Sequence, residues 1–265
     1  MRVVGDPLVA SLRAAGCVYA EAEAALLRES AAGDSQRLAD LTARRVAGEP
    51  LEPLLGWAEL DGVRVVVRPG VFVPRARSLL LVRLSVAHLA SRTPPAPAPT
   101  VVDLCCGSGA LGLLLRRALP TARVHAADVD PVATACAAEN LPPGRVHTGD
   151  LLAALPGELH GVVDLLVVNA PYVPTRHIAS MPREARDHEP LHTLDGGADG
   201  LDPHRRLLAD APSWLAPGGA LAIETSRAQA PVVVETARRN GWHATHHHDR
   251  DLDGTAVLAV RRPGE

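Results

Sequence analysis

Residues 101–112 read VVDLCCGSGALG, an apolar run of strand length followed by a glycine-rich turn. With the helical pattern that comes next, this segment predicts a strand at Thr100–Leu104, a tight turn and a helix at Gly109–Ala118. Glycine permits a tight turn and lets backbone N–H groups at a helix N-terminus come close to a ligand. The next predicted strand leads to Asp128, whose carboxylate can accept hydrogen bonds from both hydroxyls of a ribose. The segment therefore predicts a site for a nucleoside-containing cofactor.

The same glycines fit two kinds of cofactor site. Gly107-x-Gly109-x-x-Gly112, with Asp128 at about the ~20-residue offset, also matches the dinucleotide fingerprint. Asp103 separates the two, because an acidic residue at the end of the first strand is typical of class I methyltransferases. There it orders the loop and lies near the methionine end of S-adenosylmethionine, whereas dinucleotide enzymes have no comparable need for it. A turn whose glycines serve packing alone is disfavoured, since the loop and the acid occur together at the expected distance. We therefore predict that the cofactor is S-adenosylmethionine.

The predicted cofactor site also includes the end of the third strand. Gly149-Asp150-Leu151 follows that strand, so Asp150 could accept a hydrogen bond from the exocyclic amine of adenine while Leu151 packs on the ring face. A Gly-Asp pair alone is more often a turn, but its position here favours the ligand contact. The complete predicted set is Asp103, Leu104, Cys105, Cys106, Gly107, Gly109, Asp128, Val129, Asp150, Leu151 and Asn169.

Short apolar strands alternate with helical stretches after residue 100, which is typical of a parallel α/β sheet. The predicted strands are Thr100–Leu104, Val124–Ala127, Arg145–His147, Val163–Asn169, Ala220–Glu224 and Ala256–Val260. The predicted helices are Gly109–Ala118, Pro131–Asn140, Asp202–Trp214 and Ala228–Asn240. Only a short connection separates His243–His247 from Thr255–Val260, so we expect an antiparallel hairpin at the end of the sheet.

The first hundred residues have a different organisation. Apolar positions at helical spacing predict a small bundle of helices between Pro7 and Val46, and Asp61-Gly62 favours the tight turn of a β-hairpin. The other expected elements are the hairpin strands Trp57–Leu60 and Val63–Val67, a helix from about Ala76 to Ala90, and a stiff proline-rich linker at 93–99. The predicted division is a helical and hairpin domain at 1–70, a connecting segment at 71–99 and a methyltransferase domain at 100–265.

Composition narrows the partners and the compartment. A net charge of −3 with 12 histidines offers nothing that attracts a polyanion, so we expect no direct nucleic-acid binding. The N-terminal segment lacks the long apolar run of a signal or membrane helix, so no membrane partner is expected. The four cysteines lack the spacing of a zinc site, and adjacent histidines at 246–248 would alternate faces on a strand, so we predict no metal. Reduced thiols predict a cytoplasmic protein.

The tetrapeptide Asn169-Ala170-Pro171-Tyr172 follows a buried strand and is the predicted catalytic element. Ligands bind at the carboxyl ends of strands in open α/β sheets, which places it beside the cofactor loop. An amide nitrogen is a poor nucleophile because its lone pair is delocalised, and two acceptors aimed at its two hydrogens can localise that lone pair. We assign the acceptors to the Asn169 side-chain oxygen and the Ala170 carbonyl, a rigid turn to Pro171, and stacking on the planar group to Tyr172. An isolated N-x-P would instead be a simple turn.

These residues resemble the protein glutamine N5-methyltransferases, which methylate a glutamine side chain in peptide release factors or in a large-subunit ribosomal protein. The resemblance covers nearly the whole chain and implies a class I S-adenosylmethionine-dependent methyltransferase fold, which is Rossmann-like, with a helical N-terminal domain that helps to recognise a protein substrate. It rests on Arg44-Arg45-x-x-Gly48-Glu-Pro50, Leu55-Gly56, Gly70–Arg75, Asp103–Gly109, Asp128, Asp150, Asn169–Tyr172 and the Glu189–Leu201 loop.

Three departures from that family point to a related subgroup. Ala170 replaces the first proline of the usual Asn-Pro-Pro-Tyr, and Cys105 and Cys106 replace a glycine and a threonine of the cofactor loop. The run Arg75-Ala-Arg77-Ser78 replaces Arg-Pro-Glu-Thr, so an acidic residue is lost. The substituted positions leave the Ala170 carbonyl in place, so the resemblance implies a retained activity on a target that the sequence does not identify.

Three other functions fit parts of the pattern. An adenine-type amino-base methyltransferase uses a similar tetrapeptide, but the acidic balance and the lack of a basic segment with interspersed aromatics disfavour it. An NAD-dependent oxidoreductase would need a catalytic Tyr/Lys or His arrangement, which the sequence does not offer. A non-catalytic binding module is supported only by Ala170 and the cysteine pair. Glu224, near the end of a strand, is interpreted as structural or loop-orienting, because Asn169 needs no base.

Overall fold

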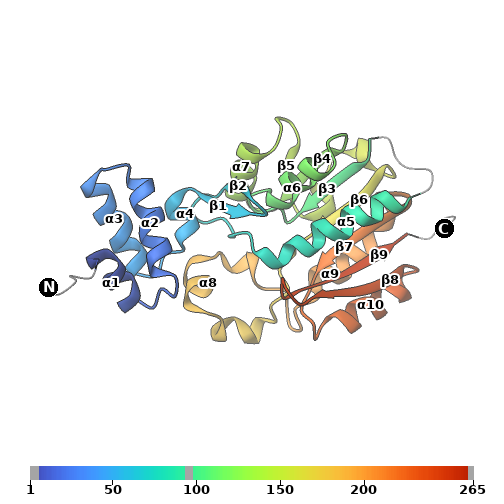
Figure 1. Cartoon of the computed structure of the whole chain (residues 1–265). Helices are drawn as coiled ribbons and strands as arrows, with labels where there is room; N and C mark the ends of the chain where they lie inside the picture. The colour runs from blue at the N-terminus through green and yellow to red at the C-terminus, as the bar shows by residue number, and fades with distance from the viewer. Residues whose placement is uncertain (1–5, 93–97, 262–265) are drawn as a thin grey trace.

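The computed structural model describes residues 6–92 and 98–261. The chain begins with a bundle of short helices that lies at one end of the molecule (Figure 1). These helices are α1 (Pro7–Ala14), α2 (Ala20–Ala31), α3 (Ser35–Val46) and α4 (Leu51–Leu55). Asp34 caps α3 by accepting from the backbone N–H groups of Gln36 and Arg37, at 2.9 and 3.0 Å. The bundle encloses a buried core that includes Leu12, Leu27 and Leu41, so the predicted helical N-terminal part is confirmed.

A two-stranded hairpin connects this bundle to the rest of the protein. Its strands are β1 (Trp57–Leu60) and β2 (Val63–Val66), and Asp61 and Gly62 both have positive φ, as the predicted tight turn requires. The backbone of Val66 exchanges two 2.9 Å hydrogen bonds with the side chain of Asn140. The hairpin is therefore anchored on the large domain as well as joined to the bundle.

The connecting segment contains a short 3₁₀ helix, η1 (Ala76–Ser78), and the helix α5 (Leu79–Ser91). Together they occupy the range predicted for one helix. Residues 93–97 of the predicted proline-rich linker lie outside the described residues.

The large domain is built on a seven-stranded sheet with the order β5-β4-β3-β6-β7-β9-β8. The strands are β3 (Thr100–Leu104), β4 (Arg123–Asp128), β5 (Val146–Thr148), β6 (Val163–Val168), β7 (Leu215–Glu224), β8 (His243–Asp249) and β9 (Gly254–Val260). The first five are parallel, whereas β9 runs antiparallel between β7 and β8. The mostly parallel sheet and its terminal antiparallel hairpin are thus confirmed.

Alternate residues of the strands pack on opposite faces of the sheet. Val101 and Leu165 belong to the cluster that includes α5 and α6, whereas Val102 and Leu166 belong to the cluster on the other face. The longer helices are α6 (Ala110–Ala118), α7 (Pro131–Asn140), α9 (Asp202–Asp210) and α10 (Ala230–Arg239). Because both faces are covered, the strands read as continuous apolar runs.

Two predicted boundaries were wrong by several residues. The strand predicted at Ala220–Glu224 begins at Leu215, because β7 pairs irregularly with β6 before it reaches regular register. The helix predicted at Asp202–Trp214 ends at Asp210 and continues as a 3₁₀ turn at Ala211–Ser213, where Pro212 has no N–H to continue the α-helical ladder. Most other sheet and helix ends of the large domain differ from the predicted ones by one or two residues, as helix and strand ends commonly do.

Candidate active site

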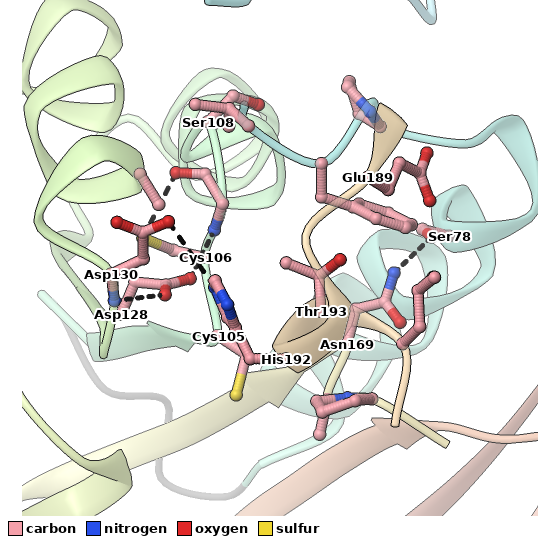
Figure 2. Close-up of a pocket in the computed structure, with 18 of the residues that line it drawn as sticks. Ser78, Cys105, Cys106, Ser108, Asp128, Asp130, Asn169, Glu189, His192 and Thr193 are labelled. Atoms are coloured by element: carbon pink, nitrogen blue, oxygen red, sulfur yellow. Dashed lines mark hydrogen bonds and ion pairs between the residues drawn. The ribbon is translucent and has the colours of Figure 1, made fainter. Parts of the chain in front are cut away.

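A cavity of about 530 Å³ opens at the carboxyl ends of β3, β4 and β6. The strand order reverses between β3 and β6, which is the position where open α/β sheets bind ligands. Its walls come from the cofactor loop, the Asn169–Tyr172 tetrapeptide, the segment 70–78 and the loop 189–194 (Figure 2). The sequence-predicted cofactor and catalytic regions therefore share one cavity.

Three predicted cofactor residues, Asp103, Leu104 and Gly109, do not line the cavity, and the first two are buried behind its wall. Asp103 is 1% exposed and accepts a 2.8 Å hydrogen bond through Oδ2 from the backbone N–H of Gly112. Its Oδ1 is buried and has no hydrogen-bond partner among the described residues. This geometry fits the expected role of ordering the loop, because the carboxylate ties the end of β3 to the first turn of α6.

Burial gives Asp103 an unusual titration. Removal from water, opposed by the Gly112 N–H and reinforced by the charge of Asp128, raises the pKa of Asp103 from 3.8 to about 8. The folded protein thus holds a proton that the unfolded chain loses near pH 4. The contribution of this proton to the free energy of unfolding is complete below pH 3.8 and is lost as the pH rises towards 8.

Asp103→Asn, which cannot titrate, should gain stability relative to the wild type as the pH is raised from 6 to 8. Urea unfolding of both proteins at pH 6 and pH 8 gives the difference between their free energies of unfolding. The titration of the other groups cancels in that difference. A difference in the free energy of unfolding that stays constant between these pH values would contradict the raised pKa.

The cofactor loop contains a non-glycine residue in a left-handed conformation. Cys105, which replaces a glycine of the family, has φ = +53°. Burial raises the pKa of both the Cys105 and the Cys106 thiols, so both are protonated near neutral pH. The Cβ of Cys105 makes this conformation unfavourable.

Cys105→Gly should therefore raise the free energy of unfolding by about 1 kcal/mol. Cys106→Gly is the matched control, because Cys106 is buried next to it without a positive φ. That variant should lose about 1–2 kcal/mol through the lost side chain and the added backbone entropy. Thermal or urea unfolding that showed both variants equally destabilised would exclude strain at Cys105.

Asp128 has the acceptors needed for a ribose. One carboxylate oxygen accepts from the Gly107 N–H at 2.9 Å and the other from the Asp130 N–H at 3.0 Å. A carboxylate has about four acceptor positions, so one remains on each oxygen for two neighbouring hydroxyls. The N–H groups of Cys106, Gly107 and Gly109 all bond within the protein, so they shape the loop instead of reaching outward as predicted. The side chains on the cavity wall fit a nucleoside cofactor.

Asp150 lies on the cavity wall with a partner that the sequence did not indicate. Its two oxygens accept hydrogen bonds from Arg206 at 3.2 and 2.6 Å. Val129 and Leu151 line the same part of the cavity, and Leu151 has a positive φ. Arg206 therefore belongs to the region predicted to hold adenine, although it stands 56 residues away in the chain.

The tetrapeptide Asn169–Tyr172 lines another side of the cavity. Asn169 donates through Nδ2 to the hydroxyl of Ser78 at 3.1 Å, which Figure 2 shows as a dashed line. Ala170 and Pro171 line the cavity, and the Tyr172 hydroxyl donates to Glu224 at 3.0 Å. Desolvation and the negative charge of Glu224 raise the pKa of Tyr172, which stays a neutral donor.

The glycines of the Glu189–Leu201 loop allow it to pack on the tetrapeptide. A Cβ at Gly196 would lie 2.7 Å from the carbonyl oxygen of Pro171, and one at Gly200 would overlap the carbonyl oxygen of Tyr172. Arg75 pairs with the buried Glu189 at the start of the loop. The glycine pattern noticed in the sequence is thus explained by close backbone approach.

Sequence reasoning missed several residues of the site. Ser78 and Arg77 contact Glu224, and His192 reaches Asp130 at 3.4 Å from across the cavity (Figure 2). Glu224 carried a signal because it ends a strand beside the site, and Arg77 and Ser78 lay in a run that was noted only for its departure from the family motif. Within the described residues, no three His, Cys, Asp or Glu side chains form a group that could hold a metal ion, and no helix is long and apolar enough to cross a membrane.

The sheet order, the acid behind the glycine loop and the Asp128 carboxylate define a class I S-adenosylmethionine-dependent methyltransferase. The methyltransferase small domain family matches residues 62–185. Among solved structures, a ribosomal protein L11 methylase from Lactobacillus delbrueckii subsp. bulgaricus shares the fold, with a TM-score of 0.53, 18% identity, and coverage of 77% of this chain and 87% of that one.

Curated relatives define the family more closely. A release factor glutamine methyltransferase of Gloeobacter violaceus is 37% identical over 232 residues, covering 85% of this chain and 79% of the relative. A 4-amino-L-phenylalanine/4-methylamino-L-phenylalanine methyltransferase of Streptomyces pristinaespiralis is 37% identical over 222 residues, covering 82% and 75%. The chain belongs to the release factor glutamine methyltransferase family, which confirms the resemblance, the fold class, the methyltransferase activity class and the S-adenosylmethionine cofactor.

Proposed function

We propose that this protein methylates the side-chain amide nitrogen of a glutamine in a protein substrate, and that it does so in the cytoplasm. The observation that carries the proposal is the Asn169–Tyr172 tetrapeptide, which lies in one cavity with the cofactor loop. A release factor is the first candidate substrate, since the relatives are named for that activity.

The site residues hold the acceptor amide by its edge and face. The Asn169 side-chain oxygen and the Ala170 carbonyl accept from the two hydrogens of the substrate NH2 group, which turns the nitrogen lone pair out of conjugation. Tyr172 packs on the planar amide, and Pro171 keeps the turn rigid. When bound, S-adenosylmethionine supplies a methyl group on a positively charged sulfur. Positioning and fixed dipoles provide most of the rate acceleration, so no strong base is required.

Asp128 and the cofactor loop hold the methyl donor in this proposal. The carboxylate of Asp128 would accept from the ribose hydroxyls, and Val129, Asp150 and Leu151 would surround the base. Asp103 acts from behind the wall by ordering the loop through Gly112. The donor and acceptor subsites thus meet between Cys105 and Asn169.

A small aromatic amine is a second candidate acceptor. The specific observation is the 37% identity with the 4-amino-L-phenylalanine methyltransferase. An arylamine also presents a planar, uncharged NH2 group, so the same two acceptors could hold it. Protein and small-molecule acceptors differ in the size of the labelled product.

The test is transfer of a radiolabelled methyl group from S-adenosylmethionine into lysate from cells that lack this protein. We expect labelled material that a membrane filter retains, that protease digests and that nuclease leaves intact. Label that passes the filter before digestion would identify a small acceptor, and label removed by nuclease alone would reject the glutamine proposal.

A further inference from the structure

A single buried carboxylate connects both polar side chains of the tetrapeptide. Glu224, at the end of β7, is 2% exposed and accepts from Ser78 Oγ at 2.6 Å, from Tyr172 Oη at 3.0 Å and from Arg77 Nε at 3.1 Å. Ser78 Oγ in turn lies 3.1 Å from Asn169 Nδ2. Glu224 thus reaches Tyr172 directly and Asn169 through Ser78.

The directions of these hydrogen bonds are fixed by chemistry. A serine hydroxyl has one hydrogen, and an ionised carboxylate can only accept. Ser78 therefore gives its hydrogen to Glu224 and presents only lone pairs to Asn169. The Asn169 carboxamide must turn its NH2 group towards Ser78, which leaves its oxygen available to a substrate in the cavity that Asn169 lines.

We propose that Ser78 and Glu224 are positioning residues that keep the oxygen of Asn169, and not its nitrogen, directed at the acceptor NH2 group. The inference rests on the proposed function, because only an acceptor with N–H hydrogens needs an oxygen there. With its carboxamide reversed, Asn169 would direct its own NH2 hydrogens at the NH2 hydrogens of the acceptor, and the two groups would repel each other.

Glu224→Gln should reverse this arrangement without removing any heavy atom. Two donors, Tyr172 and Arg77, face one side of residue 224, so the oxygen of the new carboxamide is best placed there. The NH2 group of that carboxamide then faces Ser78, which must accept from it and donate to Asn169. Asn169 would turn its oxygen to Ser78 and its NH2 group into the cavity.

The kinetic test compares wild type, Glu224→Gln, Ser78→Ala and the double variant on the same acceptor. We expect kcat to fall about 100-fold in Glu224→Gln and about 10-fold in Ser78→Ala, with an unchanged KM for S-adenosylmethionine. Ser78→Thr keeps the hydroxyl and should recover most of the kcat lost in Ser78→Ala. Since the Glu224→Gln substitution acts through Ser78, the double variant should be no slower than Glu224→Gln alone.

Ser85→Ala is the matched control for loss of a buried hydroxyl. Ser85 is fully buried on α5, and its Oγ has no hydrogen-bond partner in the part of the chain that the structure describes. This variant should keep the wild-type kcat. Multiplicative losses in the Ser78/Glu224 double variant, or a normal kcat in Glu224→Gln, would overturn the positioning role.

An NMR measurement separates this inference from the proposed function. The chain has three asparagines, so ¹⁵N-asparagine labelling gives three side-chain amide signals. The Asn169 NH2 hydrogens should exchange slowly in wild type and Ser78→Thr and quickly in Ser78→Ala, whereas Asn140, bonded to Val66 and Ser108, serves as the internal reference. If the exchange rate at Asn169 is the same in wild type and Ser78→Ala, the inference is wrong, whatever acceptor the enzyme uses. If the exchange rate depends on Ser78 but the wild type transfers no methyl group to protein, only the proposed glutamine function is wrong.

Discussion

Asn169→Ala should lower kcat by about 1000-fold and leave the Kd for S-adenosylmethionine within about tenfold of the wild type, because at most one hydrogen bond to the cofactor is lost. The variant removes the side-chain oxygen that accepts from the substrate NH2 group, and it also frees the Ser78 hydroxyl that now accepts from Asn169. The cofactor loop on the other strands is untouched. Single-turnover methyl transfer measures the first quantity, and calorimetry measures the second.

Asn240→Ala provides the control for the loss of an asparagine side chain. Asn240 caps the C-terminal end of α10, where its Nδ2 bonds to Thr236, away from the cavity. Its kcat should match the wild type. Turnover in Asn169→Ala that equals this control would refute the catalytic role of the tetrapeptide.

Asp128→Asn should weaken S-adenosylmethionine binding about 100-fold. The asparagine amide can accept only through its oxygen. Its NH2 group therefore loses one hydrogen bond from a ribose hydroxyl, and it also faces the N–H of either Gly107 or Asp130, which is a second donor. Two hydrogen bonds to a charged group contribute about 1.5 kcal/mol each at the low end, which corresponds to about two orders of magnitude in Kd.

Asp130→Asn is the matched variant for this measurement. Asp130 lines the same cavity and caps α7 through the Val132 N–H at 2.8 Å, a bond that asparagine can replace. Calorimetry should show a Kd within about threefold of the wild type. Equal losses in the two variants would show that general negative charge, and not the ribose contact, holds the cofactor, and tight binding of NAD alone would refute the assignment of S-adenosylmethionine.

The sequence predicted those parts of the site that local patterns specify. The glycine-rich turn after Thr100–Leu104 and the Asn169–Tyr172 turn after β6 each follow directly from an apolar strand, and the strand order then brings them together. The parallel strands of the core could be predicted because both faces of β3 and β6 are buried, which gives continuous apolar runs in the sequence.

The unpredicted parts depend on contacts between distant segments. Ser78 and Glu224 are separated by 146 residues, and Asp150 and Arg206 by 56. From the sequence, each of these side chains could pair with many others, and only the packing of the sheet determines which partner it contacts. The position of Asp103 behind the wall likewise depends on how α6 packs on β3.

The family substitutions also gained a structural meaning that the sequence could not supply. The change at Ala170 leaves its backbone on the cavity wall, and Cys105 occupies the left-handed conformation of the glycine it replaces. Arg77 stands where the family has an acid, yet it faces Glu224 within the site. All three positions line the same cavity.

The central claim is that the methyl group is transferred to a glutamine amide, and acid hydrolysis of the methyl-labelled product tests it most directly. Hydrolysis of an N5-methylated amide breaks the bond between carbonyl carbon and nitrogen. Once the hydrolysate of filter-retained material is made alkaline, the label should therefore leave as volatile methylamine. A label that remains non-volatile after hydrolysis, as on an arylamine or an adenine base, would contradict the account.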